Sequence, residues 1–392
     1  MKRNIFISLM ILGICLNGYS QMVSMNFPKD IISSGDPGKP TLKLEGDSLF
    51  VCCTDGIYCK DLATDSGWEP YAFQGYPLEA FVRHEGVMIA AAFNQESENE
   101  AIVLRCADKG NTVENITPES MHVEGGVNSA YYVVNNLDNP MSLVFATTWG
   151  AYTTNDFGNN WEKKEKMEVL RFGGMVRNPS DTTEIVSFGE FYNQAGCAIK
   201  YSHFIEDSFY YVPGGDNQVF DYFIHPINPR LRLLTASFTL GRSTDGGYTW
   251  THTPMEDCLI GKFLIDQEKG TIYAIGVKWQ YDPDYPGMTA GKYIIYLSND
   301  EGENWTLMYE DDKLMEPKSV RDVYDAVLYS NRILILSNYG VFDVTISDPT
   351  NITETATEHC PTTGIHDLQG RRLHNAPAKG VYIQNGKKRV VR

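Results

Sequence analysis

Short apolar or aromatic runs, separated by turn residues, recur along almost the whole chain. Residues 219–224 form one such run, an Asn-Pro turn follows, and residues 231–236 form the next run. The runs 131–135 and 143–147 repeat this order around an Asp-Asn-Pro turn. Apolar runs rich in β-branched and aromatic residues between such turns are typical of strands, and a helical period is nearly absent. The pattern therefore predicts an all-β fold.

An eight-residue motif, Ser/Thr-x-Asp-x-Gly-x-x-Trp, follows the third run of several repeats. Its three full copies are residues 154–161, 243–250 and 298–305. The Asp can accept backbone N–H bonds within its own turn, and the Gly supplies the positive φ that the turn needs. The Trp begins a strand and inserts its ring between neighbouring strands. The predicted turn-forming residues are Asp156, Gly158, Trp161, Asp245, Gly247, Trp250, Asp300, Gly302 and Trp305.

Decayed copies of the motif extend the repeat along the chain. The first positions of all copies fall at residues 59, 106, 154, 202, 243, 298 and 345. Units of roughly 40 to 50 residues with four strands each are typical of β-propeller blades. The sequence therefore predicts a seven-bladed β-propeller of four-stranded antiparallel blades. The last unit has only a weak fourth run at 352–357, so residues 22–27 are a second candidate for its outer strand.

The two ends of the chain differ from the repeats. Basic residues followed by the apolar run 5–16 and by Gly18-Tyr19-Ser20 predict a signal peptide, because the run is too short to span a membrane. The predicted organisation is a signal peptide at 1–20 cleaved near Ser20, a propeller at 21–357, and a short C-terminal β appendage at 358–392. The mature chain is expected to be secreted or to lie at the cell surface, without a membrane span.

Charge and cysteine content narrow the choice of partners and cofactors. The net charge of −17 repels phosphate backbones, so nucleic-acid binding is not expected. The seven cysteines after residue 20 lack Cys-x-x-Cys spacing, which argues against both a disulfide framework and a zinc site. Cys52 and Cys59 flank a short turn and could pair, with buried free thiols as the alternative. No metal and no cofactor are predicted.

The repeated motif resembles the Asp-box, or BNR, repeat of sialidases, sortilin-like receptors and xyloglucanases. A second resemblance lies at the C-terminus, where Asp-Leu-Gln-Gly-Arg-Arg-Leu precedes Lys-Gly-Val-Tyr-Ile and Asn-Gly-Lys-Lys. This wording is similar to the end of the type IX secretion sorting domain found in Bacteroidetes, although that domain is usually longer. Residues 364–392 contain seven basic residues and one acidic residue. The second resemblance implies that this segment engages a secretion machinery.

Ligand binding is expected on the face opposite the Asp-box turns. Each Asp-box joins the third strand of a blade to the fourth, so the loops between second and third strands gather on the other face, around a central funnel. The longest of these loops, 278–287, combines aromatic rings with carboxylates, which suits sugar rings; its alternative role is a self-packed surface loop. The predicted ligand-binding residues are Trp279, Tyr281, Asp282, Asp284 and Tyr285 in this loop, with Trp149, Tyr192 and Tyr339 at the matching turns of other blades.

Candidate catalytic residues are few. The xyloglucanase resemblance implies a catalytic aspartate at the corresponding turn of the first blade, where Cys53-Thr54-Asp55-Gly56 places Asp55. No second carboxylate at a suitable separation can be assigned, so neither inverting nor retaining hydrolysis can be assembled from the sequence. The predicted function is recognition of carbohydrate through the funnel face, as a binder or as a xyloglucanase-like glycoside hydrolase. The alternative is a non-catalytic scaffold for a secreted protein partner, as in sortilin-like receptors.

Overall fold

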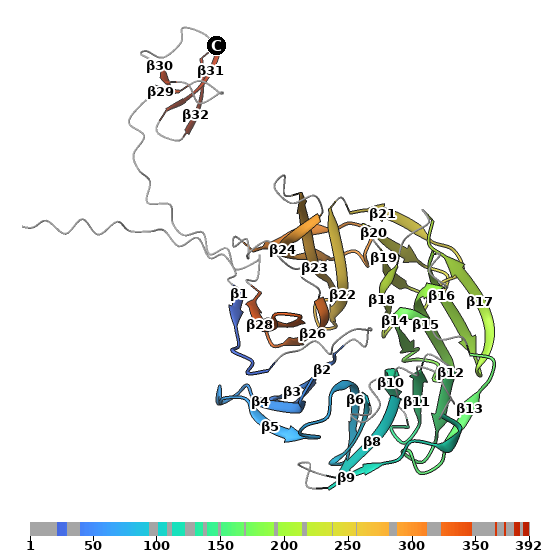
Figure 1. The fold of residues 1–392 in the computed structure, drawn as a ribbon. Helices are drawn as coiled ribbons and strands as arrows, with labels where there is room; N and C mark the ends of the chain where they lie inside the picture. Colours follow the sequence, from blue (N-terminus) through green and yellow to red (C-terminus); the bar gives the residue numbers. More distant parts are fainter. Residues whose placement is uncertain are drawn as a thin grey trace, which may run out of the picture. The chain divides into compact units, whose positions relative to one another are not determined.

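Seven four-stranded antiparallel sheets arranged around an axis form the main unit, which confirms the predicted all-β propeller (Figure 1). Each of the first six blades runs from its innermost to its outermost strand in chain order. Blades 1 to 3 consist of β2 (Leu42–Glu45), β3 (Ser48–Cys53), β4 (Gly56–Asp61) and β5 (Glu69–Ala72); β6 (Leu78–His84), β7 (Val87–Phe93), β8 (Ala101–Ala107) and β9 (Thr112–Asn115); and β10 (Ala130–Asn135), β11 (Leu143–Thr147), β12 (Gly150–Thr154) and β13 (Glu162–Lys164).

Blades 4 to 6 repeat the arrangement. They consist of β14 (Arg171–Arg177), β15 (Glu184–Phe191), β16 (Ala195–Ser202) and β17 (Ile205–Tyr211); β18 (Val219–Ile224), β19 (Arg232–Ala236), β20 (Thr239–Ser243) and β21 (Thr251–Pro254); and β22 (Cys258–Asp266), β23 (Thr271–Tyr281), β24 (Met288–Ser298) and β25 (Thr306–Glu310). The helical content of the described residues is one 3-10 turn, η1 (Glu119–Met121). The inner strands lie nearest the axis in Figure 1.

The computed structural model describes only part of the chain. The described residues are 22–29, 40–93, 101–107, 112–121, 130–135, 139–147, 150–167, 170–191, 195–213, 218–236, 238–255, 257–281, 288–311, 323–346, 365–366, 372–373, 380–384 and 387–391. The chain divides into two units, Ser20–Ile346 and a second one made of Met1–Tyr19 and Ser347–Arg392. In the second unit, β29 (Ile365–His366), β30 (Arg372–Leu373), β31 (Gly380–Gln384) and β32 (Lys387–Val391) form one sheet in the order β30-β29-β31-β32.

The N-terminal segment closes the ring. Blade 7 contains β26 (Val323–Tyr329), β27 (Arg332–Ser337) and β28 (Gly340–Thr345), and its outermost strand is β1 (Met22–Ser24). β1 pairs antiparallel with β28, with Met22 opposite Val344. Of the two closures left open by the sequence, the structure uses the N-terminal one, which covers the edge of β28 with a strand from the other end of the chain.

The residues after β1 then cross onto blade 1. Phe27 packs edge-on against Tyr58 and Trp68, with ring centroids 5.6 and 4.9 Å away. The indole N–H of Trp68 donates to the carbonyl of Met25 at 2.9 Å. Residues 22–29, called the closing segment below, therefore bind the last blade to the first through a strand pairing, a hydrogen bond and an aromatic cluster.

Each full Asp-box is a closed hydrogen-bonded turn. In the third copy, Ser298 Oγ donates to Asp300 Oδ1 at 2.8 Å and accepts from Gly302 N at 2.8 Å. The other side of the carboxylate is held by Asn304, whose backbone N donates to Oδ1 at 2.9 Å and whose Nδ2 donates to Oδ2 at 2.7 Å. The Asn304 donors, followed by Ser298, lower the pKa of Asp300 to about 2. The carboxylate is therefore ionised at neutral pH and serves as the acceptor that organises the turn.

The seventh position of the box is a further fixed donor that sequence reasoning missed. Asn160 Nδ2 donates to Asp156 Oδ2 and Thr249 Oγ1 donates to Asp245 Oδ2, both at 2.6 Å. Asn304 Nδ2 donates to Asp300 Oδ2 in the same way at 2.7 Å. The sequence has Asn160, Thr249 and Asn304 at this position, and each carries a side-chain hydrogen-bond donor. Their shared role depends on the geometry of the turn, in which they bind the second oxygen of the carboxylate.

The box glycine is required by its neighbour as well as by its turn. Gly302 has φ +79°, and a Cβ there would lie 2.8 Å from Leu233 Cδ2 in the preceding blade. The same holds for Gly158, where the nearest atom would be Ile116 Cδ1 at 2.6 Å. Backbone conformation and close approach to the previous blade therefore both favour glycine at this position.

Of the two states left open for Cys52 and Cys59, the structure has the free thiols, with Cys52 buried and Cys59 half-buried. Cys52 lies opposite Ile57 and Cys59 opposite Phe50 in the β3–β4 ladder, so the two cysteines are not directly paired. The Cys52 sulfur instead accepts from Thr41 N at 3.0 Å. Burial raises the pKa of Cys52 to about 12, which makes this thiol unreactive at neutral pH.

Candidate binding site at the mouth of the central channel

The innermost strands share an irregularity near their first residues. In blades 2 to 7 the pairing between the first and second strands shifts register at this point, which is the mark of a β-bulge. A bulge re-aims the side chain at its position, and the inner strands surround the axis, so these positions line a central channel. Because every inner strand begins where the preceding blade's last strand connects to it, the bulges lie at the funnel end.

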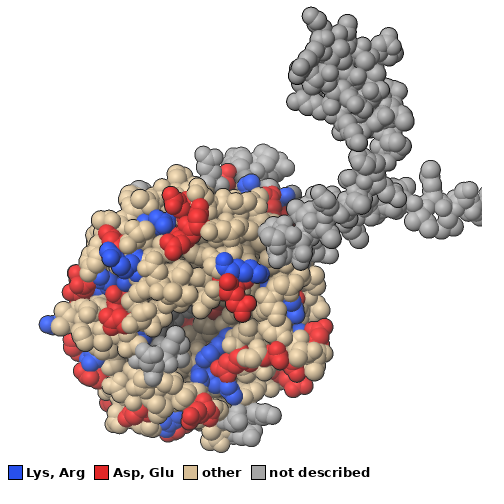
Figure 2. All heavy atoms as spheres, turned by 180° about the vertical axis from the view of Figure 1, so that it is seen from behind, with Lys and Arg blue, Asp and Glu red and all other residues tan. Residues whose placement is uncertain are grey.

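A cavity of about 220 Å³ occupies this end of the channel. Its walls come from β6, β14, β18, β22 and β26 and from the residues just before β2, and Gly173 and Gly174 leave part of the wall without side chains. One face of the propeller unit, with acidic and basic side chains interspersed and a hollow near its centre, is shown in Figure 2. The charged residues that line the cavity are Asp221, Lys262 and Asp325.

These three residues form one ionic group, called the channel triad below. Lys262 Nζ lies 3.2 Å from Asp325 Oδ1 and 3.8 Å from Asp221 Oδ1. Burial opposes the charge on Lys262, but the two aspartates outweigh it and raise the pKa of the ammonium above its usual value. One ammonium and two carboxylates leave a net formal charge of −1. The mouth of the channel is therefore a charged site with one excess negative charge.

The same aspartates also join blades. Asp221 Oδ2 accepts from the backbone N of Phe263 in the next blade at 2.8 Å. Asp325 Oδ2 accepts from the N of Leu42 at 3.0 Å, across the point where the ring closes. Each carboxylate thus has one oxygen on a neighbouring backbone and the other toward Lys262. The triad is held rigidly, with side-chain exposures of 11%, 29% and 16% for Asp221, Lys262 and Asp325.

Sequence reasoning did not single out the channel triad, although a signal was present. Asp221, Lys262 and Asp325 each interrupt an otherwise apolar run, and each stands at the bulge of its blade's first strand. A charge at one fixed position of successive repeats is unusual inside strands that are buried. Its meaning depends on the bulge, which a single sequence does not reveal.

Asp55 lies at the predicted turn between β3 and β4, but its polar contacts hold loops together. Its Oδ2 pairs with Lys29 at 2.6 Å and accepts from the Tyr58 hydroxyl at 3.0 Å, and its Oδ1 accepts from Gly75 N at 3.1 Å. The hydrogen bond from Lys29 is the main cause that lowers the pKa of Asp55. A carboxyl with a lowered pKa is ionised at neutral pH and is poorly suited to act as a general acid.

The predicted aromatic residues are only partly described. Trp279 is half-buried at the end of β23, and its backbone N donates to the carbonyl of Asp257 at 2.6 Å. Its indole Nε1 is buried without a hydrogen-bond partner in the described part of the chain. Tyr339 is 36% exposed at the turn between β27 and β28. Trp149, Tyr192, Asp282, Asp284, Tyr285 and the side chain of Tyr281 lie outside the described residues.

The fold and the Asp-box turns together define the class of the protein, which is a seven-bladed β-propeller with Asp-box turns. No protein-family model and no curated protein matches the sequence. Among solved structures, YCF48 bound to a D1 peptide is similar at 13% identity and a TM-score of 0.54, over 84% of this chain and 97% of that chain.

Two further structures are similar. A GH74 xyloglucanase from Xanthomonas campestris has 14% identity and a TM-score of 0.57 over 83% of this chain, which spans 53% of that enzyme's length. A chain of the Mitotic Checkpoint Complex has 10% identity and a TM-score of 0.56, over 89% of this chain and 98% of that chain. At these identities the likeness shows the fold. No helix among the described residues is long and apolar enough to cross a membrane.

Proposed function

We propose that the protein is a recognition propeller that binds a basic segment of a partner polypeptide at the mouth of its central channel. The observation that carries this proposal is the channel triad, which places two carboxylates beside one ammonium in a walled cavity. A lysine or arginine of the partner would find carboxylate oxygens there, and Lys262 retains donors for a backbone carbonyl. The likeness to the peptide-bound YCF48, over nearly all of that chain, supports this use of a single propeller.

The charge of the whole protein favours the same ligand. The net charge of −17 attracts a cationic segment and accelerates its encounter, and the effect weakens with salt. The ionic network in the channel is formed before any ligand arrives, so binding would cost little reorganisation.

The direct test is binding of fluorescein-labelled nonapeptides that carry either three lysines or three glutamates on a common neutral background. We expect the lysine peptides to bind and Asp221→Asn to weaken them by about tenfold, as for the loss of one charge in a partly desolvated site. Asparagine keeps an oxygen for Phe263 N, so the blade contact survives. The matched control is Glu206→Gln on the outer strand β17, which changes the net charge equally.

Fluorescence anisotropy at two salt concentrations would separate site from surface effects. Equal weakening by Asp221→Asn and Glu206→Gln would overturn the proposal, because it would place the attraction on the general surface. Equal binding of lysine and glutamate peptides would overturn it as well. A thermal unfolding scan of both variants verifies that neither has lost the fold.

Carbohydrate recognition is the second candidate, and Trp279 favours it. Its half-buried ring offers the exposed part of an aromatic face beside the predicted loop 278–287. A glycan array with Trp279→Ala as the variant is the test, since alanine removes the ring. If hydrolysis accompanied binding, Asp55 would act as a base rather than an acid, because Lys29 keeps it ionised.

We also propose that the protein is exported from the cell that makes it. It rests on the signal-peptide pattern at 1–20 and on the sorting-type wording in 364–392, most of whose positions lie outside the described residues. N-terminal sequencing of protein recovered from the producing cells should begin at Gln21, and an uncleaved Met1 would contradict it.

A further inference from the structure

A cavity of about 380 Å³ lies between blades 2 and 3 on the Asp-box face. It is at the other end of the strands from the channel mouth, so it is independent of the function proposed above. Most of its wall is apolar, with a polar edge on one side. The apolar residues are Val87, Ala107, Met141 and Phe157, and the polar edge includes Arg105, Glu114 and Asn159.

An equivalent seam lies between blades 4 and 5, and the strand-pairing registers of the two blades show which residues correspond. Arg105 in β8 pairs with Ile89 in β7. Ile89 lies two residues before Ala91, the β7 residue that pairs with β6 directly after its bulge. In blade 4, Lys200 in β16 pairs with Val186, two residues before the bulge partner Phe188. Arg105 and Lys200 therefore occupy equivalent positions, and each faces the Asp-box of the following blade.

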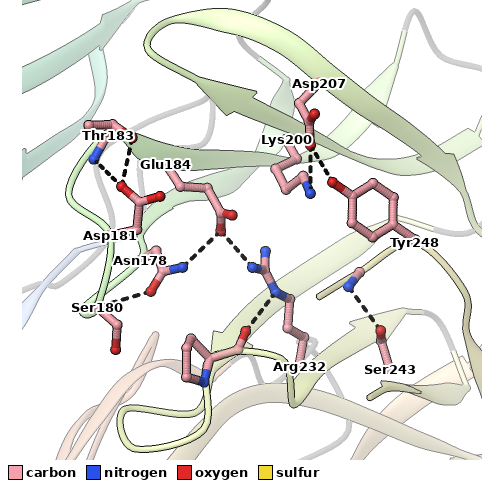
Figure 3. A network of polar contacts seen from close by, with 12 residues as sticks. Asn178, Ser180, Asp181, Thr183, Glu184, Lys200, Asp207, Arg232, Ser243 and Tyr248 are labelled. Carbon is pink, nitrogen blue, oxygen red and sulfur yellow. Dashed lines mark hydrogen bonds and ion pairs between the residues drawn. The ribbon is translucent and has the colours of Figure 1, made fainter. Parts of the chain in front are cut away.

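The seam between blades 4 and 5 is covered by an aromatic ring, that of Tyr248, which stays 57% exposed. Tyr248, the sixth residue of its Asp-box, has its ring centroid 3.6 Å from Lys200 Nζ. Its hydroxyl donates to Asp207 Oδ2 at 2.9 Å, and that carboxylate also pairs with Lys200 at 2.6 Å. Figure 3 shows this arrangement of cation, ring and carboxylate.

The seam between blades 2 and 3 has the cation and the carboxylate but no ring at the sixth box position. Arg105 Nε and Nη2 donate to Glu114 Oε2 at 3.1 and 2.8 Å. The sixth box residue here is Asn159, whose Oδ1 accepts from Arg105 Nη1 at 2.7 Å. The short asparagine leaves Arg105 without the ring that covers Lys200 in the other seam, and the cavity lies beside Arg105.

We propose that this cavity binds a tyrosine side chain from an exposed segment of a partner polypeptide. The ring would lie against the Arg105 guanidinium, and the hydroxyl would donate to Glu114, as Tyr248 does with Lys200 and Asp207. A guanidinium fixed by a carboxylate and an amide is already oriented for stacking. Tyrosine is among the residues that most often anchor protein interfaces in such pockets, and the volume matches a small binding site.

A third seam supplies the matched control. Between blades 5 and 6, Arg242 Nε donates to the backbone carbonyl of Glu301 at 2.9 Å, and the sixth box residue is Glu303. A tyrosine placed at 303 is equivalent in the repeat to one at 159 but lies far along the ring from the cavity. It tests whether any added tyrosine changes binding.

The experiment is saturation-transfer NMR on the full chain with N-acetyltyrosinamide as the probe. We expect transfer to the ring protons at a probe concentration of about 5 mM, the range in which a fragment of this size binds. Asn159→Tyr should abolish the transfer, because the new side chain fills the cavity itself. Glu303→Tyr should leave it unchanged.

Two further measurements test the contacts. Arg105→Met should weaken the probe by about tenfold, the loss expected with a desolvated cation–π contact. N-acetylphenylalaninamide should bind more weakly than the tyrosine probe, because it has no hydroxyl for Glu114. The proposal is overturned if wild type shows no transfer, if Asn159→Tyr retains it, or if Glu303→Tyr loses it equally.

Discussion

Deleting the closing segment, residues 22–29, should abolish the cooperative unfolding of the propeller. The deletion removes the pairing of β1 with β28, the aromatic contacts of Phe27 and the carbonyl that accepts from Trp68. It also removes Lys29, the partner of Asp55. Loss of the buried ring contacts and the strand pairing together is expected to cost about 5 kcal/mol or more, comparable with the whole stability of a domain.

Urea unfolding followed by tryptophan fluorescence would measure this loss, and hydrogen exchange in β28 would locate it. The matched control is Val23→Ala within the same strand, because Val23 is 54% exposed and its truncation should change stability by less than about 0.5 kcal/mol. A synthetic peptide of residues 21–29 should restore protection when added in excess. An unchanged urea midpoint in the deletion variant would show that the ring is closed by other contacts.

Replacing Glu184 by leucine should be the most costly single substitution in the seam between blades 4 and 5. Glu184 Oε1 lies 2.7 Å from Arg232 Nη2 and accepts from Asn178 Nδ2 at 3.2 Å, as Figure 3 shows. Arg232 is only 3% exposed, and its Nη1 has no hydrogen-bond partner within the described residues. Without Glu184 a buried guanidinium would lose its counter-charge, which costs about 3–5 kcal/mol.

The double variant Glu184→Leu/Arg232→Leu distinguishes this cause from a packing defect. Removing both charges should recover most of the lost stability, since buried ion pairs replaced by apolar residues are often neutral. The coupling energy from the double-mutant cycle is the quantity to measure by urea unfolding. Glu162→Leu, at the exposed pair with Lys164, is the control and should change little. A double variant as unstable as Glu184→Leu alone would contradict the electrostatic explanation.

The channel triad and the closing segment illustrate one way of closing a ring. Asp325 bonds the first blade at Leu42, while β1 adds to the outer edge of the seventh blade. The junction between the ends of the chain is thus held at the axis by a charge and at the rim by a strand. The ion pair of Asp55 with Lys29 adds a further contact between the closing segment and the first blade.

The Asp-box turns could be predicted from sequence because their interactions are local. Asp245 is held by Ser243, Tyr248 and Thr249, all within four residues, and the hydrogen bonds of Thr249 are the main cause that lowers its pKa. A turn of this kind needs the same residue types wherever it occurs, so its copies mark successive repeats. The spacing of those copies, with the apolar runs between them, predicted seven four-stranded blades but left the outer strand of the last blade open.

The candidate sites depend on contacts that the sequence does not order. Lys262 meets Asp221 and Asp325 because bulges in three different blades aim them at one axis, and Asp55 meets Lys29 because the closing segment crosses the first blade. The cavity beside Arg105 is lined by residues of two blades, with Asn159 of the next blade at the position that Tyr248 occupies in the equivalent seam. The sequence by itself determined the repeating blade, since each turn is made within eight neighbouring residues. Only the tertiary structure decided which charges meet and where a cavity forms, because those depend on residues brought together across blades.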